Sequence, residues 1–188
     1  MKTLIINNET SLLEKLKALI PGEKVVREWS DIPMGKETEA FDLIVLSGSS
    51  SFSLREFEEK FIKEEIFVKN SKTPVIGICF GCELIARTFG GTLKKLPQKE
   101  RGIIKVDVLA DEGIFGDKRS FDVYASHEWA IGKMPEDFTV LARSKNSIMA
   151  IKHKTLPIYG FQFHPENLTE KTYGDEIFFN CLKGFAKR

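Results

Sequence analysis

Residues 74–89, Pro-Val-Ile-Gly-Ile-Cys-Phe-Gly-Cys-Glu-Leu-Ile-Ala-Arg-Thr-Phe, join an apolar run to a segment with helical apolar spacing. The run at 74–78 predicts a buried β-strand, and the spacing from about Cys82 to Phe89 predicts an α-helix. Cys79 lies at the turn between them. Gly77 and Gly81 flank this turn, where a Cβ would obstruct close packing of the helix on the strand. The stretch therefore predicts a strand–turn–helix unit that exposes the Cys79 side chain at its apex.

The sequence that precedes this unit alternates apolar strands with helices. The predicted strands are residues 4–6, 25–26 and 42–46, and the predicted helices are residues 12–20 and 54–68. Near-continuous apolar strands alternating with helices predict a parallel sheet that is covered on both faces. In such sheets the functional site lies at the carboxyl ends of the strands, where Cys79 and the loop at 47–51 both fall.

The second half of the sequence is richer in β-structure. Short β-rich runs separated by turns lie at residues 103–109, 122–125, 138–142, 147–151 and 158–163, and residues 174–186 predict a closing helix. These runs predict hairpins or extra strands on the same domain. Because there is no internal repeat, low-complexity segment or linker, we expect one domain over residues 1–188.

Composition and charge narrow the class of protein. The chain has 28 Lys and Arg, 27 Asp and Glu and a net charge of +1, so we expect no field that attracts nucleic acid or an acidic membrane. No segment has the pattern of a signal peptide or a membrane span. Three cysteines cannot all pair, so we expect reduced thiols and a cytoplasmic protein.

Cys79 and His164 are the candidate reactive residues. A thiol at the start of a helix is a candidate nucleophile, because the helix N-terminus stabilises a thiolate. His164 follows an apolar run at 158–163, and Glu166 lies close enough to orient its imidazole after a local turn. The alternative interpretations are a buried structural cysteine and a capping histidine beside a surface glutamate.

The two motifs together resemble those of the class I (triad-type) glutamine amidotransferase family. Residues 77–83 (Gly-Ile-Cys-Phe-Gly-Cys-Glu) look like its nucleophile motif, and residues 161–166 (Phe-Gln-Phe-His-Pro-Glu) look like its base-and-orienter motif. The resemblance covers nearly the whole chain and implies an α/β, flavodoxin-like fold with a mixed, mostly parallel central sheet flanked by helices. Within the family, residues 142–144, 150–153 and 157–160 look most like the separate amidotransferase subunit of archaeal-type GMP synthases.

The resemblance also implies roles for individual residues. Cys79 would be the nucleophile, His164 the general base and then acid, and Glu166 the residue that orients His164. The backbone amides of Phe80 and of the Gly48-Ser49 loop would hold the oxyanion. Further substrate or partner contacts would come from the following residues: Glu83, Arg101, Gly102 and His127.

Three departures from the family pattern leave alternatives open. Ser49 stands where a second glycine is usual, which predicts backbone strain if that position needs a glycine-only conformation. Glu83 stands where glutamine is usual; an ionised carboxylate only accepts hydrogen bonds, whereas an amide also donates. In this respect the chain resembles the γ-glutamyl hydrolases, relatives in which a glutamate is found at the position of Glu83. A Trp129 in place of an aspartate also weakens the likeness to GMP synthase subunits.

Other chemistries compete for the same residues. Cys79 and Cys82 form a C-x-x-C pair, which permits a redox interpretation but leaves the His164 motif unexplained. A structural zinc site would need about four ligands, and Cys181 has no partner motif, so we expect no metal. His153, in a Lys-His-Lys turn, is predicted to be solvated. No organic cofactor is implied.

The sequence thus predicts a glutaminase that releases ammonia through a Cys79 γ-glutamyl thioester. No nucleotide-binding motif is present, so the acceptor chemistry is expected on a separate ATP-dependent synthetase subunit. GMP synthase would be one such partner and would place the protein in purine biosynthesis. The alternatives are a stand-alone γ-glutamyl hydrolase-like amidase, which would also take a γ-glutamyl substrate, and a weakly active regulatory or binding subunit.

Overall fold

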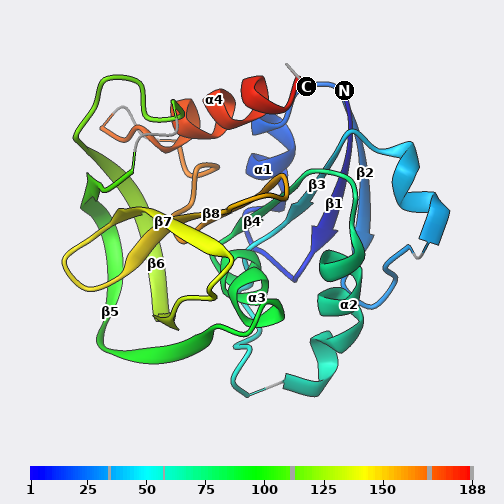
Figure 1. Ribbon diagram of the computed structural model, residues 1–188, viewed down its shortest axis with the longest axis horizontal. Coiled ribbons are helices and arrows are strands. Elements are labelled where there is room, and N and C mark those ends of the chain that lie inside the picture. The colour runs from blue at the N-terminus through cyan, green and yellow to red at the C-terminus, as the bar shows by residue number, and fades with distance from the viewer. Residues whose placement is uncertain (34, 57, 111–112, 169–170, 187–188) are drawn as a thin grey trace.

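The computed structural model describes residues 1–33, 35–56, 58–110, 113–168 and 171–186. In this part of the chain nine strands form one sheet, in the order β2-β1-β3-β4-β9-β8-β7-β5-β6 (Figure 1). The strands are β1 (Lys2–Asn7), β2 (Glu23–Glu28), β3 (Leu43–Leu46), β4 (Val75–Ile78), β5 (Thr92–Val108), β6 (Ser120–Lys133), β7 (Phe138–Arg143), β8 (Ile148–His153) and β9 (Ile158–Phe161). The helices are α1 (Leu13–Leu19), α2 (Ile62–Asn70), α3 (Phe80–Thr88) and α4 (Gly174–Ala186), with 3₁₀ helices at Gly35–Ala40 and Glu58–Phe61.

The sheet has a parallel half and an antiparallel half. Strands β2, β1, β3, β4 and β9 pair in parallel, and β9, β8, β7, β5 and β6 pair antiparallel. Strands β1, β3, β4 and β9 are buried on both faces, which explains their largely apolar sequences. The predicted α/β fold, with a mixed sheet flanked by helices, is confirmed. One domain over the whole chain stays a prediction.

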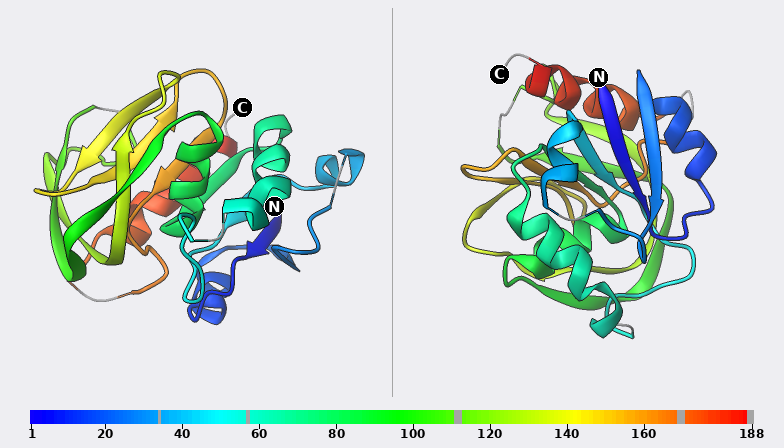
Figure 2. Two further views of the ribbon diagram at one scale, coloured as in Figure 1. Left: turned by 90° about the horizontal axis from the view of Figure 1, so that it is seen from below. Right: turned by 90° about the vertical axis from the view of Figure 1, so that its right-hand side faces the viewer.

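Helices cover both faces of the parallel half (Figures 1 and 2). Successive residues of β1 point to opposite faces, so Ile5 packs in one core and Leu4 and Ile6 pack in the other. The core around Ile5 includes apolar residues of α1 and α4, and the core around Leu4 includes those of α2 and α3. The closing helix agrees with its predicted range, 174–186.

Three predicted elements were wrong in extent. The helix predicted at 54–68 is confined to α2, and residues 58–61 form a 3₁₀ helix. The strand predicted at 103–109 begins at Thr92, and the one predicted at 122–125 runs from Ser120 to Lys133. The charged sequence of β5 has no apolar pattern from which this long hairpin could be predicted, because β5 and β6 pair through backbone hydrogen bonds. The register shifts between Lys95 and Glu100, around Pro97, which has no N–H to donate.

Both glycines beside Cys79 allow the strand and helix to meet. A Cβ on Gly77 would lie 2.4 Å from the carbonyl oxygen of Gly81, and one on Gly81 would lie 2.5 Å from that of Leu46. Both separations are far below van der Waals contact, and the atoms they meet are backbone. The predicted packing reason for these glycines is confirmed.

We expect Gly77→Ala to destabilise the protein by about 3 kcal/mol, because the new methyl group would push α3 away from β4. This loss corresponds to a fall in Tm of roughly 10 °C for a chain of this size. The matched control is Gly184→Ala on α4, where a Cβ would meet nothing within 4 Å. That change should be neutral or stabilising by up to about 1 kcal/mol, since alanine is the better helix former. Thermal unfolding of both variants checks the prediction, and equal melting temperatures would contradict it.

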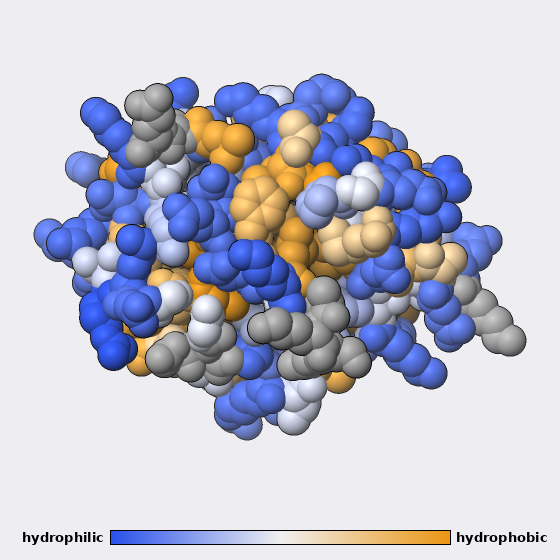
Figure 3. Space-filling view, turned by 90° about the horizontal axis from the view of Figure 1, so that it is seen from above, coloured by the Kyte–Doolittle hydropathy of each residue, from blue (hydrophilic) through white to orange (hydrophobic). Residues whose placement is uncertain are grey.

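The surface is mostly hydrophilic, as the interspersed charges predict. The space-filling view, which shows the molecule from above relative to Figure 1, has hydrophilic residues around an apolar area near the middle of the visible face (Figure 3). Among the helices of the described residues, none combines the length and the apolar character needed to cross a membrane.

Candidate active site

The candidate residues meet at the carboxyl edge of the parallel strands. Cys79 follows β4, the loop at Ser47 follows β3, and His164 lies just beyond the end of β9. Asn8, which the sequence did not single out, follows β1. Carboxyl ends of neighbouring parallel strands lie at one edge, so four loops distant in sequence surround one place.

Cys79 adopts an unusual backbone conformation. Its φ is 50° and its ψ is −105°, outside the regions that L-residues ordinarily occupy. The first hydrogen bond of α3 runs from Glu83 N–H to Cys79 O. The backbone N–H of Phe80 lies before this bond, among the N–H groups at a helix start that have no acceptor within the helix. The thiol is 6% exposed. This strand–turn–helix unit is the predicted elbow, held in a strained conformation by β4 and α3, but the prediction of an exposed Cys79 side chain is wrong, because neighbouring loops bury it.

His164 links Cys79 to Glu166. Its Nδ1 lies 2.9 Å from Oε1 of Glu166, and the sulfur of Cys79 is hydrogen-bonded to the imidazole. The His164 backbone N–H donates to the carbonyl of Tyr124 on β6, which anchors the loop to the antiparallel half of the sheet. Glu166 is 1% exposed, so its carboxylate faces the ring in a medium of low dielectric. The three side chains therefore form a continuous sulfur–imidazole–carboxylate arrangement.

The charge state of His164 follows from these neighbours. Burial acts to lower the pKa of His164, but the Cys79 thiolate and the Glu166 carboxylate outweigh it and raise the pKa well above its ordinary value. Both neighbours therefore favour the cationic form of the imidazole. A thiolate next to an imidazolium is the activated form of a cysteine nucleophile.

The loop after β3 approaches both reactive residues. A Cβ on Gly48 would lie 3.2 Å from Cε1 of His164 and 3.6 Å from Cβ of Cys79. Ser49 does not have a positive φ, so the strain predicted for this position is absent. Instead its hydroxyl accepts hydrogen bonds from the amides of Ser51 and Phe52, at 3.2 and 2.8 Å, and stabilises the turn.

A buried polar network supports this loop. Ser47 Oγ donates to the carbonyl of Gly48 at 2.8 Å and accepts from the amide of Asn8 at 2.9 Å. The Asn8 side-chain amide donates to Glu64 Oε1 at 3.2 Å. Burial raises the pKa of Glu64 to about 8, although the hydrogen bond from Asn8 acts to lower it. Burial therefore favours the neutral form of Glu64, and its second carboxyl oxygen and Asn8 Oδ1 are both buried without a hydrogen-bond partner.

The protonated Glu64 predicts a pH-dependent stability. An unfolded glutamate loses its proton near pH 4.5, whereas folded Glu64 keeps it to about pH 8. The folded state therefore binds more protons in this window, so the free energy of unfolding should fall as pH rises from 5 to 8. One group contributes at most about 1.4 kcal/mol per pH unit.

Glu64→Gln should remove the contribution of Glu64 to the pH dependence of the free energy of unfolding, because a glutamine side chain does not titrate. Denaturant unfolding at pH 5, 6, 7 and 8 measures the slope. Glu14→Gln, at an exposed position on α1, is the control and should leave it unchanged. Parallel slopes for wild type and Glu64→Gln would contradict the prediction.

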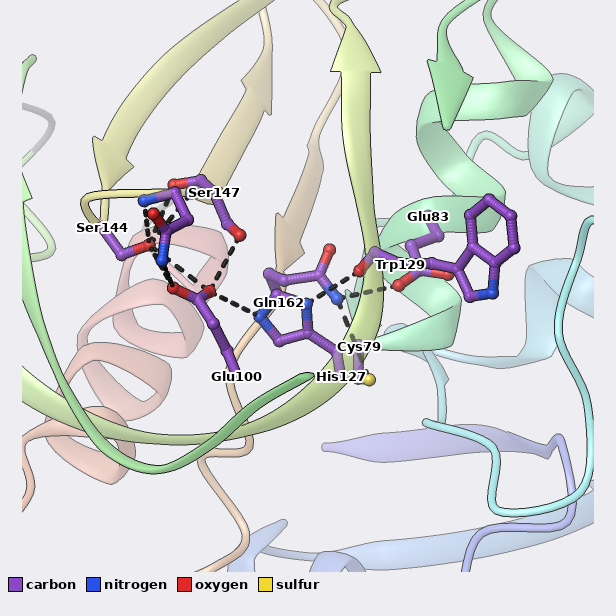
Figure 4. A network of polar contacts seen from close by, with 9 residues as sticks. Cys79, Glu83, Glu100, His127, Trp129, Ser144, Ser147 and Gln162 are labelled. Atoms are coloured by element: carbon purple, nitrogen blue, oxygen red, sulfur yellow. Dashed lines mark hydrogen bonds and ion pairs between the residues drawn. The ribbon is translucent and has the colours of Figure 1, made fainter. Parts of the chain in front are cut away.

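Glu83 lies beside the nucleophile, one helical turn further along α3. Its Oε1 accepts a hydrogen bond of 2.9 Å from Nε2 of Gln162, whose amide also lies 3.9 Å from the Cys79 sulfur (Figure 4). Burial raises the pKa of Glu83 to about 8, although the Gln162 hydrogen bond and the charge of His164 act to lower it. Burial thus favours a neutral Glu83, which could donate as well as accept a hydrogen bond, and the sequence does not show how deeply the side chain is buried.

Two cavities flank the reactive residues. The first, of about 170 Å³, is lined by Cys79, Phe80, Glu83 and His127 among others. The second, of about 320 Å³, is lined by His164 and Arg101. Ser49 and Lys99 border both cavities. Gly102 borders neither; it pairs with Ala125 in the β5–β6 hairpin at a φ of 113°.

His127 belongs to a second polar network (Figure 4). Its Nδ1 donates to the carbonyl of Trp129 at 2.8 Å. Its Nε2 lies 3.2 Å from Glu100 Oε2, but without the alignment of a hydrogen bond. Burial lowers the pKa of His127 more than the Trp129 carbonyl and the Glu100 carboxylate raise it. Glu100 also accepts hydrogen bonds from three side chains of the β7–β8 turn: Ser144, Asn146 and Ser147.

Cys82 lies apart from this chemistry. It is fully buried in the core on the α3 side, and a Cβ on Gly160 would lie 2.7 Å from its sulfur. Burial raises the pKa of the Cys82 thiol well above its ordinary value. Cys79, Cys82 and Cys181 are all free thiols. The redox interpretation would need Cys82 as a second accessible sulfur, and this sulfur is buried in the core.

Several residues of the site were missed from the sequence. Gln162 had a local signal, since it is a polar residue between two phenylalanines in an apolar segment. Asn8, Glu64 and Glu100 had none, because each acts through a partner at least 27 positions away along the chain. These three residues can be recognised only in the folded structure, where distant segments lie side by side.

Comparisons with known proteins point to one family. The family model described as "Glutamine amidotransferase class-I" matches residues 4–185. The glutamine-hydrolysing GMP synthase of Thermosipho melanesiensis is 38% identical over 145 residues, 77% of this chain and 28% of that protein. A subunit of the glutamine-hydrolysing GMP synthase of Pyrococcus abyssi is 36% identical over 146 residues, 77% of this chain and 73% of the relative.

A solved structure is similar over the full length. The crystal structure of a GMP synthase subunit from Thermoplasma acidophilum matches with a TM-score of 0.87 and 30% identity, and the match covers 100% of this chain and 94% of that one. By sequence and by fold, the chain belongs to the class I glutamine amidotransferase family.

Proposed function

We propose that this protein hydrolyses the side-chain amide of glutamine at Cys79 and supplies the ammonia to a synthetase. The observation that carries the proposal is the hydrogen-bonded arrangement of Cys79, His164 and Glu166 beside a cavity of about 170 Å³. Family membership supports the reaction, and the names of the relatives suggest GMP synthase as the acceptor enzyme.

The residues account for each proton in the reaction. The Cys79 thiolate attacks the amide carbon of glutamine, and the carbonyl oxygen becomes an oxyanion. His164, as the imidazolium, gives its proton to the leaving nitrogen, and ammonia departs as the γ-glutamyl thioester forms. Water then gives a proton to neutral His164 and attacks the thioester, which releases glutamate and restores the thiolate–imidazolium pair. Glu166 stabilises the imidazolium in the steps where it is charged.

The oxyanion would lie between the elbow and the Gly48-Ser49 loop. The Phe80 amide, at the start of α3, and the Ser49 amide are the proposed donors. Ser47 holds the carbonyl of Gly48, and the N–H of the same trans peptide points the opposite way. A donor placed for the transition state is typically worth about 2.7–4 kcal/mol of barrier.

The acceptor enzyme is proposed to be a separate, ATP-dependent synthetase. Ammonia is protonated in bulk water, so a glutaminase that supplies it gains from direct contact with the acceptor site. The chain spans only 28% of the length of the Thermosipho relative, so the synthetase chemistry is proposed to take place outside residues 1–188. A stand-alone γ-glutamyl hydrolase is the second candidate, and the carboxyl of Glu83 in the cavity is what favours it.

Measuring ammonia release from glutamine, with and without the synthetase of an archaeal-type GMP synthase, tests the proposal. Stimulation by the synthetase together with ATP and its nucleotide substrate is the expected result. Turnover of γ-glutamyl peptides by the chain alone, without stimulation, would support the second candidate. Absence of ammonia release and of a Cys79 thioester under every condition would overturn both.

A further inference from the structure

Glu64 is a buried carboxyl group on α2 that the reaction described above does not use. It is 1% exposed, and the two residues that join it to the active site, Asn8 and Ser47, have no exposed surface. Glu64 Oε1 accepts a hydrogen bond from the side-chain amide of Asn8 at 3.2 Å. A buried polar group is costly unless it is hydrogen-bonded, so the contact with Asn8 decides how the carboxyl is held.

The side-chain amide of Asn8 joins two acceptors. Its Nδ2 donates to the backbone carbonyl of Ser47 at 3.3 Å and to Glu64 Oε1 at 3.2 Å, so the two acceptors share its two N–H groups. An amide turned by 180° exchanges its nitrogen for its oxygen. In the turned orientation Asn8 Oδ1 would face both acceptor oxygens and be repelled by them. The acceptor on Glu64 therefore helps to fix the orientation in which Asn8 donates to Ser47.

Ser47 links Asn8 to the loop after β3. The backbone N–H of Asn8 donates to Ser47 Oγ at 2.9 Å, and Ser47 Oγ donates to the carbonyl of Gly48 at 2.8 Å. Asn8 thus holds Ser47 at both its hydroxyl and its carbonyl. Because the N–H and the carbonyl of a trans peptide point opposite ways, fixing the Gly48 carbonyl also fixes the direction of the Ser49 N–H. That N–H is one of the two proposed oxyanion donors.

The loop lies against the reacting groups. A Cβ on Gly48 would lie 3.2 Å from Cε1 of His164 and 3.6 Å from Cβ of Cys79, and Ser49 lines the same cavity as Cys79. A misplacement of about 1 Å in a catalytic group can slow a reaction about 100-fold. A small rotation of the Gly48–Ser49 peptide would therefore lower the rate, although every reacting group is still present.

We propose that Asn8 and Glu64 are positioning residues that set the direction of the Ser49 oxyanion donor through Ser47. Glu64 holds the amide of Asn8, and Asn8 holds Ser47, so an acceptor on α2 acts on the transition state across three successive hydrogen bonds. The inference rests on the proposed glutaminase function, since the oxyanion forms only in that reaction. The property of residue 64 that the loop needs is its acceptor oxygen, whatever its charge.

Two reactions of Cys79 separate the oxyanion donor from the nucleophile. Glutamine hydrolysis passes through an oxyanion, whereas alkylation of the thiolate by iodoacetamide forms none. A misdirected Ser49 N–H should lower kcat for glutamine and leave KM and the alkylation rate close to those of wild type, because the donor acts only in the transition state. Ammonia release, with the synthetase and its substrates present, gives kcat and KM. Mass spectrometry of the protein gives the alkylation rate.

Two substitutions at position 64 test the acceptor. Glu64→Met has a similar volume but no acceptor oxygen, so kcat should fall about 10- to 100-fold. Glu64→Gln keeps an oxygen that can accept from Asn8, so kcat should stay close to that of wild type. The matched control is Val68→Ala, one helical turn further along α2 at a fully buried position of the core. It should lower the melting temperature and leave kcat unchanged.

A variant of Asn8 tests whether the two residues act through one route. Leucine has nearly the shape of asparagine without its polar atoms, so Asn8→Leu should lower kcat at least as much as Glu64→Met. Adding Glu64→Met to Asn8→Leu should cause no further loss of kcat, because the effect of Glu64 passes through Asn8. The double variant removes both partners of their hydrogen bond, which costs less stability than leaving one of them unpaired.

The outcomes are distinct. A wild-type kcat in Glu64→Met, equal losses in Glu64→Met and Glu64→Gln, or a double variant whose loss is the product of the single losses would overturn the role of these residues and leave the glutaminase proposal intact. If the single variants fail to fold, a wild-type kcat in the folded double variant would overturn it equally. Alkylation of Cys79 in every form, without ammonia release from glutamine even in wild type, would overturn the proposed function and this inference with it.

Discussion

Replacing Cys79 with alanine is expected to reduce glutamine hydrolysis to the background rate, a loss of about 10⁶-fold on the scale of other triad nucleophiles. The sulfur is the atom to which His164 is hydrogen-bonded, and no other accessible thiol lies among the described residues of the site. Covalent labelling by a glutamine analogue should disappear in the same variant. Ammonia release and the mass of the labelled protein measure the two effects.

Cys82→Ala is the matched control for this loss. Cys82 is three residues away on α3 and has no exposed surface, so its truncation removes core packing and leaves the nucleophile in place. We expect it to cost about 1 kcal/mol of stability and to retain labelling at Cys79. Labelling that is lost with Cys82→Ala and retained with Cys79→Ala would instead support the redox interpretation.

His164→Ala is expected to have the next largest effect, a fall in kcat of about 10²- to 10⁴-fold. The variant removes the group that accepts a proton from water and gives one to the leaving ammonia. It also leaves Glu166, which is 1% exposed, without its cationic partner. Thermal unfolding should therefore accompany the kinetic measurement, so that a loss of activity is not confused with a loss of fold.

Glu166→Gln separates orientation from acid–base chemistry. The glutamine has the same size and keeps an oxygen for the hydrogen bond from Nδ1, but its charge no longer stabilises the imidazolium. We expect an intermediate loss of kcat and a lower pKa for His164, visible by NMR titration of the imidazole. A variant with wild-type kcat and an unchanged His164 pKa would show that Glu166 has no part in the reaction.

The local features of the fold were accessible from the sequence. The apolar run at 74–78, the glycines on either side of Cys79 and the helical spacing after it predict the elbow, because each acts on residues close along the chain. The closing helix α4 was predicted for the same reason. The motif at 161–166 likewise predicted that His164 and Glu166 would be neighbours, and their side chains lie 2.9 Å apart.

His153 illustrates where a local pattern fails. Its Lys-His-Lys context predicted a solvated side chain, yet it is 6% exposed and packs between Phe89 and Phe138, with ring centroids 5.2 and 4.9 Å away. Its Nδ1 accepts hydrogen bonds from the amides of Thr155 and Leu156. The neighbouring lysines gave no sign of this, because the aromatic residues come from the end of α3 and from β7.

By itself, the sequence determined the order of the elements, the elbow and the candidate nucleophile, base and orienting carboxylate, since periodicity, turn residues and short motifs act over a few positions. Only the tertiary structure decided the burial that raises the pKa of Glu83 and Glu64, the relaxed conformation of Ser49 and the participation of Asn8, Glu100 and Gln162. The reason is that burial and hydrogen bonding depend on which distant segments meet. A carboxyl group written as Glu in the sequence becomes an anion or a neutral donor according to what surrounds it.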